Sequence, residues 1–481
     1  MKRYFLHLLL FCVACGSAAA QSTFTITDSM QWKAYDDFNE ALLDKSRYIY
    51  KADTEQKNAD HRGNGARDND RSGCAAAIWC QAIYYDMVIN AYNRAKNEGN
   101  EELMKKYKAL HSKIYKGEKT HYVDFDFHNS NTNNGWFVYD DIMWWTCALA
   151  RAYETFGLKD LLNYSERSFC RVWYGSATVG DDGSYADPAR FSGQYGGGMF
   201  WEWQPIDHAK PHNPGDFRSA CINFPTVIAA CLLHQLVPTG RTAPTQTRPT
   251  RQTKEWYLEK AIEIYDWADK TLVSSGRVAD GIHGGGPEFT DHLYNQATYI
   301  GASCLLYKIT GDDKYKSRAI NGTKYVFNKM VNGNKILNFE NGYEQGIYAA
   351  IFAQYLPMVI YDLQQTTYLK YIQRNMQKAW DNRDAERGLQ AGNFLNKTSG
   401  SDVVESYGGS ALPALMLMFP AHITADDIVN EVETVSSAVA PADDNIYTLD
   451  GKLVMKKADF CQVAHLNKGL YIFRNKKIMI K

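Results

Sequence analysis

The stretch AAAIWCQAIYYDMVI, residues 75–89, indicates the fold class of this protein. Its apolar residues are spread so broadly around a helix of about 3.6 residues per turn that most of the helix surface must be buried. Similar segments recur between residues 29 and 419, and no comparable series of alternating strands is present there. The further segments that we expect to be helical are 141–156, 220–236, 256–272, 293–309, 314–331, 343–363 and 368–380.

Two connections show how these helices end. Gly157 in Gly-Leu-Lys-Asp (157–160) and Gly311 in Thr-Gly-Asp-Asp (310–313) are glycine stops followed by acidic starts of the next helix. Many helices with short turns, some apolar on most sides, indicate helical hairpins arranged around a ring. A long bundle or an open superhelix would show much of the same pattern, so periodicity alone leaves the architecture open.

The composition excludes some functional classes. The 481 residues are enough for a large core and more than one domain. The formal net charge of −1 gives no whole-protein field for nucleic acid or an anionic membrane, so we expect no nucleic-acid partner. The chain is rich in aromatic residues, which fill cores and also form stacking surfaces for sugars or bases.

The N-terminus resembles an export signal over residues 1–20. Residues 2 and 3 are basic, residues 5–13 are mostly apolar, and residues 18–20 are small. We therefore expect an exported protein of the periplasm, the cell surface or the extracellular space. Lipid anchoring through Cys15 is the less favoured alternative, because Cys12 stands where a bulky aliphatic residue is usual.

The composition changes near the C-terminus. A linker is predicted over 431–444 and a small β module over 445–481, where Asp450-Gly451 between two apolar runs is a hairpin signal. The hairpin, Lys-Gly-Leu-Tyr-Ile (468–472) and the basic finish resemble the C-terminal sorting tail of the type IX secretion pathway. This resemblance implies secretion machinery as a partner; a stabilising β appendage is the alternative.

No motif predicts a metal or cofactor. Eight cysteines follow the export signal without a close CxxC pair, so we expect buried free thiols. His208 and His212 have the spacing of a metal pair, but Pro211 and Pro214 argue against a regular helix there. We therefore expect an activity that uses neither a metal nor an organic cofactor.

Asp140 and Asp141 are two adjacent acids flanked by aromatic residues. The simple interpretation is a helix start, where an acid accepts free backbone N–H groups. The alternative is a catalytic pair, because burial and a neighbouring carboxylate both disfavour ionisation and can leave one acid protonated. Glycoside hydrolysis needs one proton donor and one carboxylate, and the spacing permits either retention or inversion.

Residues 136–145, which contain this pair, resemble the signature of glycoside hydrolase family 76, the endo-α-1,6-mannanases. Segments 196–201, 218–225, 293–302 and 343–348 resemble further family motifs in the same order. The resemblance covers most of residues 70–380. It implies an all-α, (α/α)6 toroid with its site in a groove at one end, which we expect over residues 28–430. It also implies an α-mannan substrate and retention, with Asp140 as nucleophile and Asp141 as acid/base.

The matching motifs supply candidate substrate-binding residues. Glycines could let the backbone approach a sugar, aromatic rings could stack on it and amides could bind its hydroxyls. A flexible loop, core packing and helix capping are the respective alternatives. Arg218, Leu293 and Ala297 replace residues common in the family, which leaves subsite detail and branching tolerance open. The candidates are Tyr139, Trp144, Gly196, Gly197, Gly198, Trp201, Asn223, Tyr294, Asn295 and Gln296.

Two rival functions fit the same sequence. One is a glycan-binding surface protein on the same toroid, with a catalytically silent acid pair. The other is an (α/α)6 enzyme that acts on another sugar, such as a uronide. Binding without release of reducing ends would indicate the first, and product release from a different polysaccharide would indicate the second.

Overall fold

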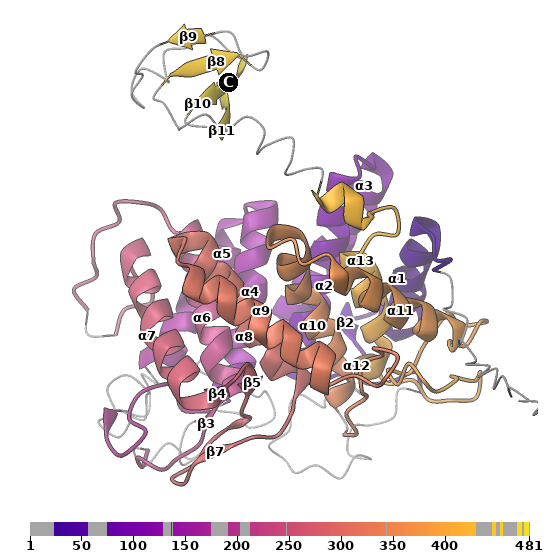
Figure 1. Ribbon diagram of the computed structural model, residues 1–481, viewed down its shortest axis with the longest axis horizontal. Coiled ribbons are helices and arrows are strands. Elements are labelled where there is room, and N and C mark those ends of the chain that lie inside the picture. Colours follow the sequence, from indigo (N-terminus) through magenta and orange to yellow (C-terminus); the bar gives the residue numbers. More distant parts are fainter. Residues whose placement is uncertain are drawn as a thin grey trace, which may run out of the picture.

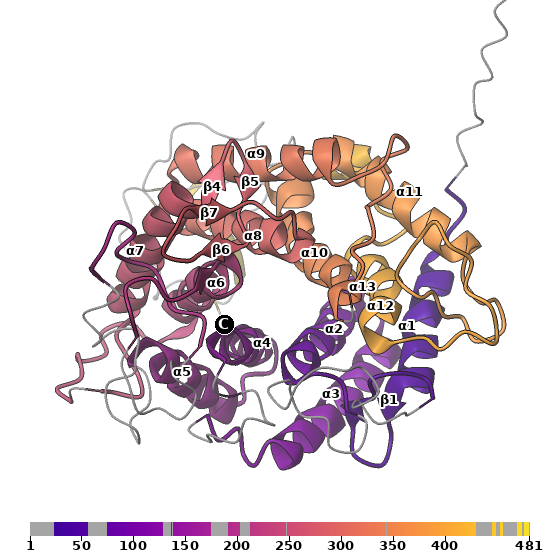
Figure 2. The same cartoon turned by 90° about the horizontal axis from the view of Figure 1, so that it is seen from below.

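The computed structural model describes residues 24–55, 75–127, 136, 138–174, 191–202, 212–246, 248–342, 344–429, 445–448, 453–455, 469–473 and 476–480. Within these residues, helices form two concentric rings (Figure 2). Each inner helix contacts the next, and the last contacts the first, so the ring is closed. The inner helices are α2 (Ile78–Asn97), α4 (Tyr139–Phe156), α6 (Ala220–Leu236), α8 (Leu293–Thr310), α10 (Tyr348–Pro357) and α13 (Ala411–Met418).

The outer ring pairs with the inner one. Helices α3, α5, α7 and α9 pack on α2, α4, α6 and α8, while α1 and α11 pack on α13. This arrangement confirms the predicted (α/α)6 toroid. The outer helices are α1 (Asp28–Leu42), α3 (Glu101–His121), α5 (Lys159–Tyr174), α7 (Lys254–Leu272), α9 (Asp313–Lys329) and α11 (Thr367–Asp381).

The distribution of apolar residues assigns each helix to its ring. Helix α6 is buried at every position from Ala220 to Leu233, as expected of a helix with neighbours on all sides. Helix α3 buries a single stripe, Tyr107, His111, Ile114 and Glu118, at successive spacings of four, three and four residues. One buried stripe suits a helix that faces the inner ring on one side and solvent on the other.

Helix ends follow the predicted signals. Gly157 and Gly311 adopt left-handed φ angles of 70° and 71° and end α4 and α8, which confirms the glycine stops. Asp312 then caps α9, because its Oδ1 accepts the backbone N–H of Lys314 at 2.9 Å. The chain therefore turns tightly from an inner to an outer helix.

The prediction of a single helix over 343–363 is wrong. The structure has a 3-10 turn, η4 (Gln345–Ile347), then α10, then a π-helical turn, η5 (Met358–Asp362). Pro357 explains the change, because it has no backbone N–H and its ring crowds the carbonyl one turn earlier. The hydrogen-bond ladder widens there, and the Leu363 N–H donates to the Met358 carbonyl at 3.1 Å.

Short strands lie at the end of the ring where the inner helices begin. The strands β3 (Arg218–Ser219), β6 (Gly281–Ile282) and β7 (Pro287–Glu288) form a three-stranded antiparallel sheet in the order β3-β6-β7. Strand β3 runs directly into α6, and β3 and β7 lie together along one edge of the molecule (Figure 1). Strand pairs β1 (Leu43–Asp44) with β2 (Ile49–Tyr50) and β4 (Val273–Ser274) with β5 (Arg277–Val278) close two further turns.

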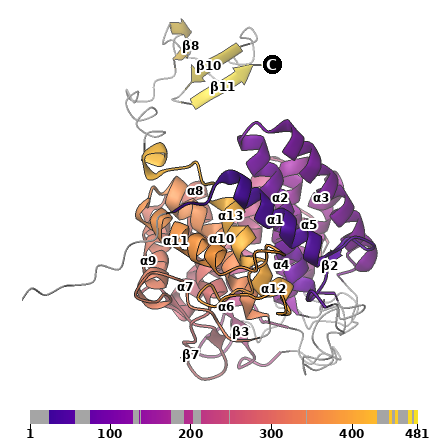
Figure 3. The ribbon, with the colours of Figure 1, turned by 90° about the vertical axis from the view of Figure 1, so that its right-hand side faces the viewer.

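The predicted C-terminal β module is present as a small antiparallel sheet in the order β11-β10-β8-β9. Figure 3 shows its strands β8, β10 and β11. Ile446 pairs with Met455 across the predicted hairpin, whose turn lies outside the described residues, as does the linker 431–444. The strands are β8 (Ile446–Thr448), β9 (Leu453–Met455), β10 (Gly469–Phe473) and β11 (Lys476–Ile480).

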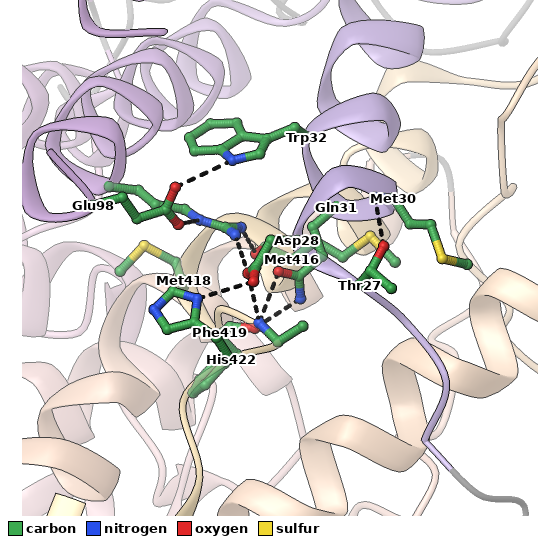
Figure 4. A network of polar contacts seen from close by, with 12 residues as sticks. Thr27, Asp28, Met30, Gln31, Trp32, Glu98, Met416, Met418, Phe419 and His422 are labelled. Atoms are coloured by element: carbon green, nitrogen blue, oxygen red, sulfur yellow. Dashed lines mark hydrogen bonds and ion pairs between the residues drawn. The ribbon is translucent and has the colours of Figure 1, made fainter. Parts of the chain in front are cut away.

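A polar network closes the ring by joining α1, α2 and the segment after α13 (Figure 4). Arg94 forms ion pairs of 2.6 Å with both Asp28 and Glu98 and donates to the Met416 carbonyl at 2.7 Å. His422 Nδ1 lies 3.0 Å from the second oxygen of Asp28. These contacts tie the first described helix to the last inner one.

One sequence expectation concerns the cysteines. The six cysteines in the described part of the chain are all buried free thiols, which confirms the prediction for them. Cys74 and Cys461 lie outside the described residues. In the described part, we find no helix with the length and apolar character that a membrane crossing requires.

Candidate active site

The N-terminal ends of five inner helices converge on one cavity of about 410 Å³. The first turn of each helix contributes to its lining: Trp79 from α2, Asp141 from α4, Cys221 from α6, Tyr294 from α8 and Tyr348 from α10. The inner helices therefore point the positive ends of their dipoles toward the same space. This end of the ring is suited to hold negative charge.

The cavity is strongly acidic. Five carboxyl groups line it, and its described lining contains no Lys, Arg or His. Helix N-termini and neutral donors compensate negative charge at the cavity surface, and His292 lies 4.0 Å from Asp280 behind it. The five acids are Asp140, Asp141, Glu202, Asp280 and Glu344.

Asp140 and Asp141 lie in the first turn of α4 and do not cap it. The N-cap is Val138, which makes no side-chain capping bond, and the two acids lie in the first turn, where negative charge suits the helix dipole. Their exposed fractions are 9% and 6%, and both line the cavity. The backbone N–H of Asp141 donates to Asp140 Oδ1 at 3.0 Å.

The environment changes the acidity of Asp140. Burial raises the pKa of this carboxyl to about 6. Hydrogen bonds from Cys221, at 3.1 Å to Oδ2, and from the Trp201 side chain lower the pKa and limit the rise. Asp140 is thus a carboxylate at neutral pH that gains a proton under mildly acidic conditions.

Aromatic rings form two walls of the cavity. Trp79 and Trp144 lie with ring centroids 6.1 Å apart, and the Trp79 indole donates to Glu344 at 2.7 Å. Tyr294 and Tyr348 stack with centroids 4.1 Å apart and an interplanar angle of 16°. Such faces match the apolar faces of sugar rings, while the carboxylates accept from sugar hydroxyls.

The structure divides the sequence-predicted site residues into two groups. Asp140, Asp141, Trp144, Trp201 and Tyr294 line the cavity. The others do not line it, and their contacts show what they do instead. These are Tyr139, Gly196, Gly197, Gly198, Asn223, Asn295 and Gln296.

The glycine loop packs against a tryptophan and is held by Asn223. A Cβ atom on Gly197 or Gly198 would come within 2.4 Å of the Trp267 ring, and both glycines have positive φ. The fully buried amide of Asn223 accepts from the Met199 N–H at 2.8 Å and donates to the Ser219 carbonyl at 2.7 Å. This burial does not support sugar contact by Asn223; the residue fixes the loop that carries Trp201.

Buried amides on α8 also support neighbouring backbone and side chains. Gln296 accepts from the Val278 N–H at 2.6 Å and donates to the Gly276 carbonyl at 2.9 Å, so it holds the β4–β5 turn. Asn295 donates to Asp280 Oδ1 at 3.0 Å and so orients a cavity acid. The predicted sugar contacts of these amides are not supported, because both side chains are buried.

Tyr139 and Gly196 also make packing and backbone contacts within the fold. The Tyr139 side chain is fully buried, and its backbone N–H donates to the Trp201 carbonyl at 2.8 Å. A Cβ atom on Gly196 would lie 2.6 Å from the Phe191 carbonyl oxygen. Together with the bridge between Val138 and Glu202, these contacts place the loop beside Asp140.

Sequence reasoning missed several lining residues that one signal could have found. Trp79, Cys221 and Tyr348 lie in the first turn of an inner helix. In a ring of parallel inner helices, first-turn side chains must meet at one mouth. Glu344 belongs to a quoted family segment, whereas Asp280, on the loop before β6, had no local signal.

A larger cavity of about 630 Å³ lies at the opposite mouth, among the C-terminal ends of α2, α10 and α13. Asp28, Glu98 and His422 come within 4.8 Å of one another beside it. Arg94 already forms ion pairs with both acids there, and a cation therefore occupies the place that a metal ion would take. His212, from the sequence-level histidine pair, contacts the Glu202 carbonyl at 2.6 Å; His208 lies outside the described residues.

The fold and the site together define an (α/α)6 toroid with an acidic, aromatic cavity at one mouth, an arrangement suited to binding carbohydrate. A model of glycosyl hydrolase family 76 matches residues 48–418. The chain belongs to this family and is a glycosidase by membership. A comparison with curated proteins found no significant match.

Solved structures share the fold at low sequence identity. The α-1,6-mannanase of a Salegentibacter species is 20% identical with a TM-score of 0.60, over 81% of this chain and 98% of that one. An inactive variant of it, with two consecutive aspartates changed to asparagine, is complexed with α-1,6-mannotriose at the same identity, TM-score and coverage. A family 76 mannosidase of Bacteroides thetaiotaomicron is 17% identical with a TM-score of 0.60, over 85% and 99%.

Proposed function

We propose that this protein is an endo-acting, retaining α-1,6-mannanase in which Asp140 is the nucleophile and Asp141 the acid/base. The observation that carries the proposal is the position of two consecutive aspartates in the first turn of α4, at the cavity surface. Family membership supports it. So does the relative that was inactivated at two consecutive aspartates and then complexed with an α-1,6-linked mannotriose.

The first step forms a covalent intermediate. An oxygen of the Asp140 carboxylate attacks the anomeric carbon while the bond to the glycosidic oxygen breaks. Asp141 gives its proton to that oxygen, so the leaving chain departs as a neutral alcohol. The aromatic walls hold the sugar rings in place during attack.

The second step releases the product. Asp141, now a carboxylate, takes a proton from a water molecule as the water oxygen attacks the anomeric carbon. The bond to Asp140 breaks and its carboxylate is restored. Two displacements at the same carbon retain the anomeric configuration.

Hydrogen bonds support the role given to Asp140. Its two oxygens accept from the Asp141 backbone and from Cys221, and donors of this kind favour the charged form. Dipoles of the converging helices act in the same direction. A nucleophile must be ionised when substrate arrives, and Asp140 meets that condition at neutral pH.

The charge of the cavity favours a neutral polymer over a uronide. A polyuronide would bring carboxylates into a space that already holds five acids and no cation in its described lining. The carboxylates of the polymer and those of the cavity would repel one another. Mannan carries no charged group, and its hydroxyl groups donate hydrogen bonds to carboxylates.

The test is hydrolysis of linear α-1,6-mannan by the purified protein, with Asp140→Asn and Asp141→Asn assayed alongside. We expect oligosaccharides with retained configuration from the wild type and none from either variant. Full activity in either variant would refute the assigned roles. Binding of mannan without release of reducing ends by the wild type would instead favour the non-catalytic glycan-binding protein.

We also propose that the protein is exported through its N-terminal segment and that the C-terminal sheet acts as a sorting tail. The support is the charge and hydropathy pattern of residues 1–20 and the strand pattern of residues 445–481. An intact-mass measurement on protein secreted by the native host tests both. The mature mass should lack both segments, and a retained C-terminal sheet would favour a stabilising appendage.

A further inference from the structure

We propose that Cys221 is a positioning residue for Asp140, with its thiol holding one carboxylate oxygen while the Asp141 backbone holds the other. The inference rests on the proposed function, because it assigns a role relative to the proposed nucleophile. Cys221 was not among the residues that the sequence motifs singled out as site candidates. It lies in the first turn of α6, across the cavity from α4.

The contacts around the thiol form a directed chain. Cys221 Sγ lies 3.1 Å from Asp140 Oδ2 and 2.9 Å from Ser219 Oγ. Burial raises the pKa of the Cys221 thiol well above its usual range, so it remains an S–H group. An ionised carboxylate only accepts, so the S–H points to Asp140 and the Ser219 hydroxyl donates to sulfur.

With both oxygens held, the Asp140 carboxylate has a fixed plane. Asp141 N–H binds Oδ1 at 3.0 Å, Cys221 S–H binds Oδ2 and the Trp201 side chain donates as well, so three of the four carboxylate lone pairs are held and one is left for attack. A fixed plane lowers the cost of orienting the nucleophile. The glycosyl ester of Asp140 is a weaker acceptor than the carboxylate, so the thiol bond also favours breakdown of the intermediate.

Other ionisable groups face Asp140 from every neighbouring element. They are Asp141 on α4, Glu202 on the loop before β3, Asp280 before β6, Glu344 before η4, Tyr294 on α8 and Tyr348 on α10. Behind them, His292 at the start of α8 lies 4.0 Å from Asp280. Cys221 contributes to the raised pKa values of Tyr294 and Tyr348, but burial keeps both phenols protonated throughout the acidic range. A difference between the acidic limbs of the wild type and a Cys221 variant therefore reports the contact between the thiol and Asp140.

The pH dependence of kcat/KM on α-1,6-mannan tests the role. The acidic limb falls where the nucleophile gains a proton, and loss of a donor to its carboxylate moves that point upward. We expect Cys221→Ala to move the acidic limb to higher pH by about 0.5 to 1 unit, the scale of one weak hydrogen bond. Cys221→Ser, which keeps a donor, should leave the limb at or below the wild-type position.

A matched control and a readout without turnover complete the design. Cys231→Ala removes another buried thiol of α6 and should leave the acidic limb unchanged, while melting temperatures verify folding of all variants. The infrared difference between the wild type and Cys221→Ala isolates one S–H stretch. We expect this band below that of the other thiols, and we expect Asp140→Asn to raise it.

The outcomes separate this inference from the proposed function. The role of Cys221 would be overturned if the wild type hydrolyses mannan and Cys221→Ala leaves the acidic limb unmoved. It would also be overturned if Asp140→Asn does not change the frequency of the S–H band. Absence of mannan hydrolysis in the wild type would refute the proposed function. The infrared band would still decide whether the thiol holds Asp140.

Discussion

The two mouths of the ring hold acids in opposite ways. At the mouth formed by helix N-termini, five carboxyl groups line the cavity and its described lining holds no cation. At the mouth formed by helix C-termini, Asp28 and Glu98 both pair with Arg94, and His422 contacts Asp28 (Figure 4). The larger cavity lies at the second mouth, but the larger number of cavity-lining acids lies at the first.

The helix dipoles explain the difference. The inner helices are parallel, so their positive ends meet at one mouth and tolerate carboxylates there, while cations suit the other mouth. At the C-terminal mouth a cation compensates the acids, whereas at the N-terminal mouth burial raises the pKa of Asp140. The proposed catalysis therefore lies at the mouth with the smaller cavity, whereas the ion pairs at the other mouth join the first described helix to the last inner one.

The largest expected effect compares one acid from each mouth. We expect Asp140→Asn to lower kcat/KM on α-1,6-mannan by at least about 10³-fold, because an amide cannot form the glycosyl ester. Asp28→Asn should stay within about twofold of the wild type, because it only loosens the closure of the ring. Initial rates of reducing-end release measure both. Comparable losses in the two variants would remove the functional distinction between the mouths.

Local patterns in the sequence predicted most of the helices and drew attention to the acid pair, whereas the closed ring was expected from the family resemblance. The long apolar segments and glycine stops depend on a few consecutive residues, and so does the tandem Asp140-Asp141. The partners of the pair depend on how distant segments close up. Asp280 reaches the cavity on a loop of its own, and a lone Asp-Gly dipeptide on a loop gives no sign of that.

A residue type in a family motif can be required for the fold rather than for binding. Asn223 and Gln296 belong to segments that resemble family motifs, and their side-chain amides form hydrogen bonds with backbone groups. Only the burial of these side chains separates such a role from sugar binding, and burial follows from tertiary packing. Pro357 shows the reverse case, because its effect on the helix predicted over 343–363 was readable from its chemistry.

The second prediction concerns stability at the C-terminal mouth. Arg94→Met should lower the free energy of unfolding by about 2–4 kcal/mol, because it leaves two acids without their cation and the Met416 carbonyl without its donor. Denaturant titration at pH 7 measures the loss. The activity per folded molecule should remain that of the wild type, and a matched fall in kcat would show that the mouths are coupled.

The third prediction has the opposite sign at the N-terminal mouth. The pKa of Asp140 is raised in the fold from 3.8 to about 6, so the folded state binds the proton more tightly than the unfolded state. Its contribution to stability is present at low pH and is lost as pH rises through about 4 to 6. Asp140→Asn should therefore raise the free energy of unfolding at pH 7 by up to about 3 kcal/mol.

Melting curves at two pH values measure that gain. The difference between Asp140→Asn and the wild type should be larger at pH 7 than at pH 4, because the carboxyl is protonated in the fold at the lower pH. Asp28→Asn serves as the control from the other mouth and should lower the melting temperature at pH 7. Destabilisation by Asp140→Asn at pH 7 would mean that this acid contributes to the fold as the paired acids do.

The smallest expected effect refines the electrostatics within the acidic mouth. Glu344→Gln removes one negative charge from the cavity and keeps an oxygen that can accept from the Trp79 indole. With less repulsion, Asp140 should ionise more readily, and the acidic limb of kcat/KM should move to lower pH by about 0.2–0.5 unit. The shift is opposite in sign to that expected for Cys221→Ala.

Glu98→Gln should cause no shift, because Arg94 and solvent screen that charge at the far mouth. Equal shifts in Glu344→Gln and Glu98→Gln would mean that Asp140 senses the net charge of the protein, and the distinction between the mouths would then lie in catalysis alone.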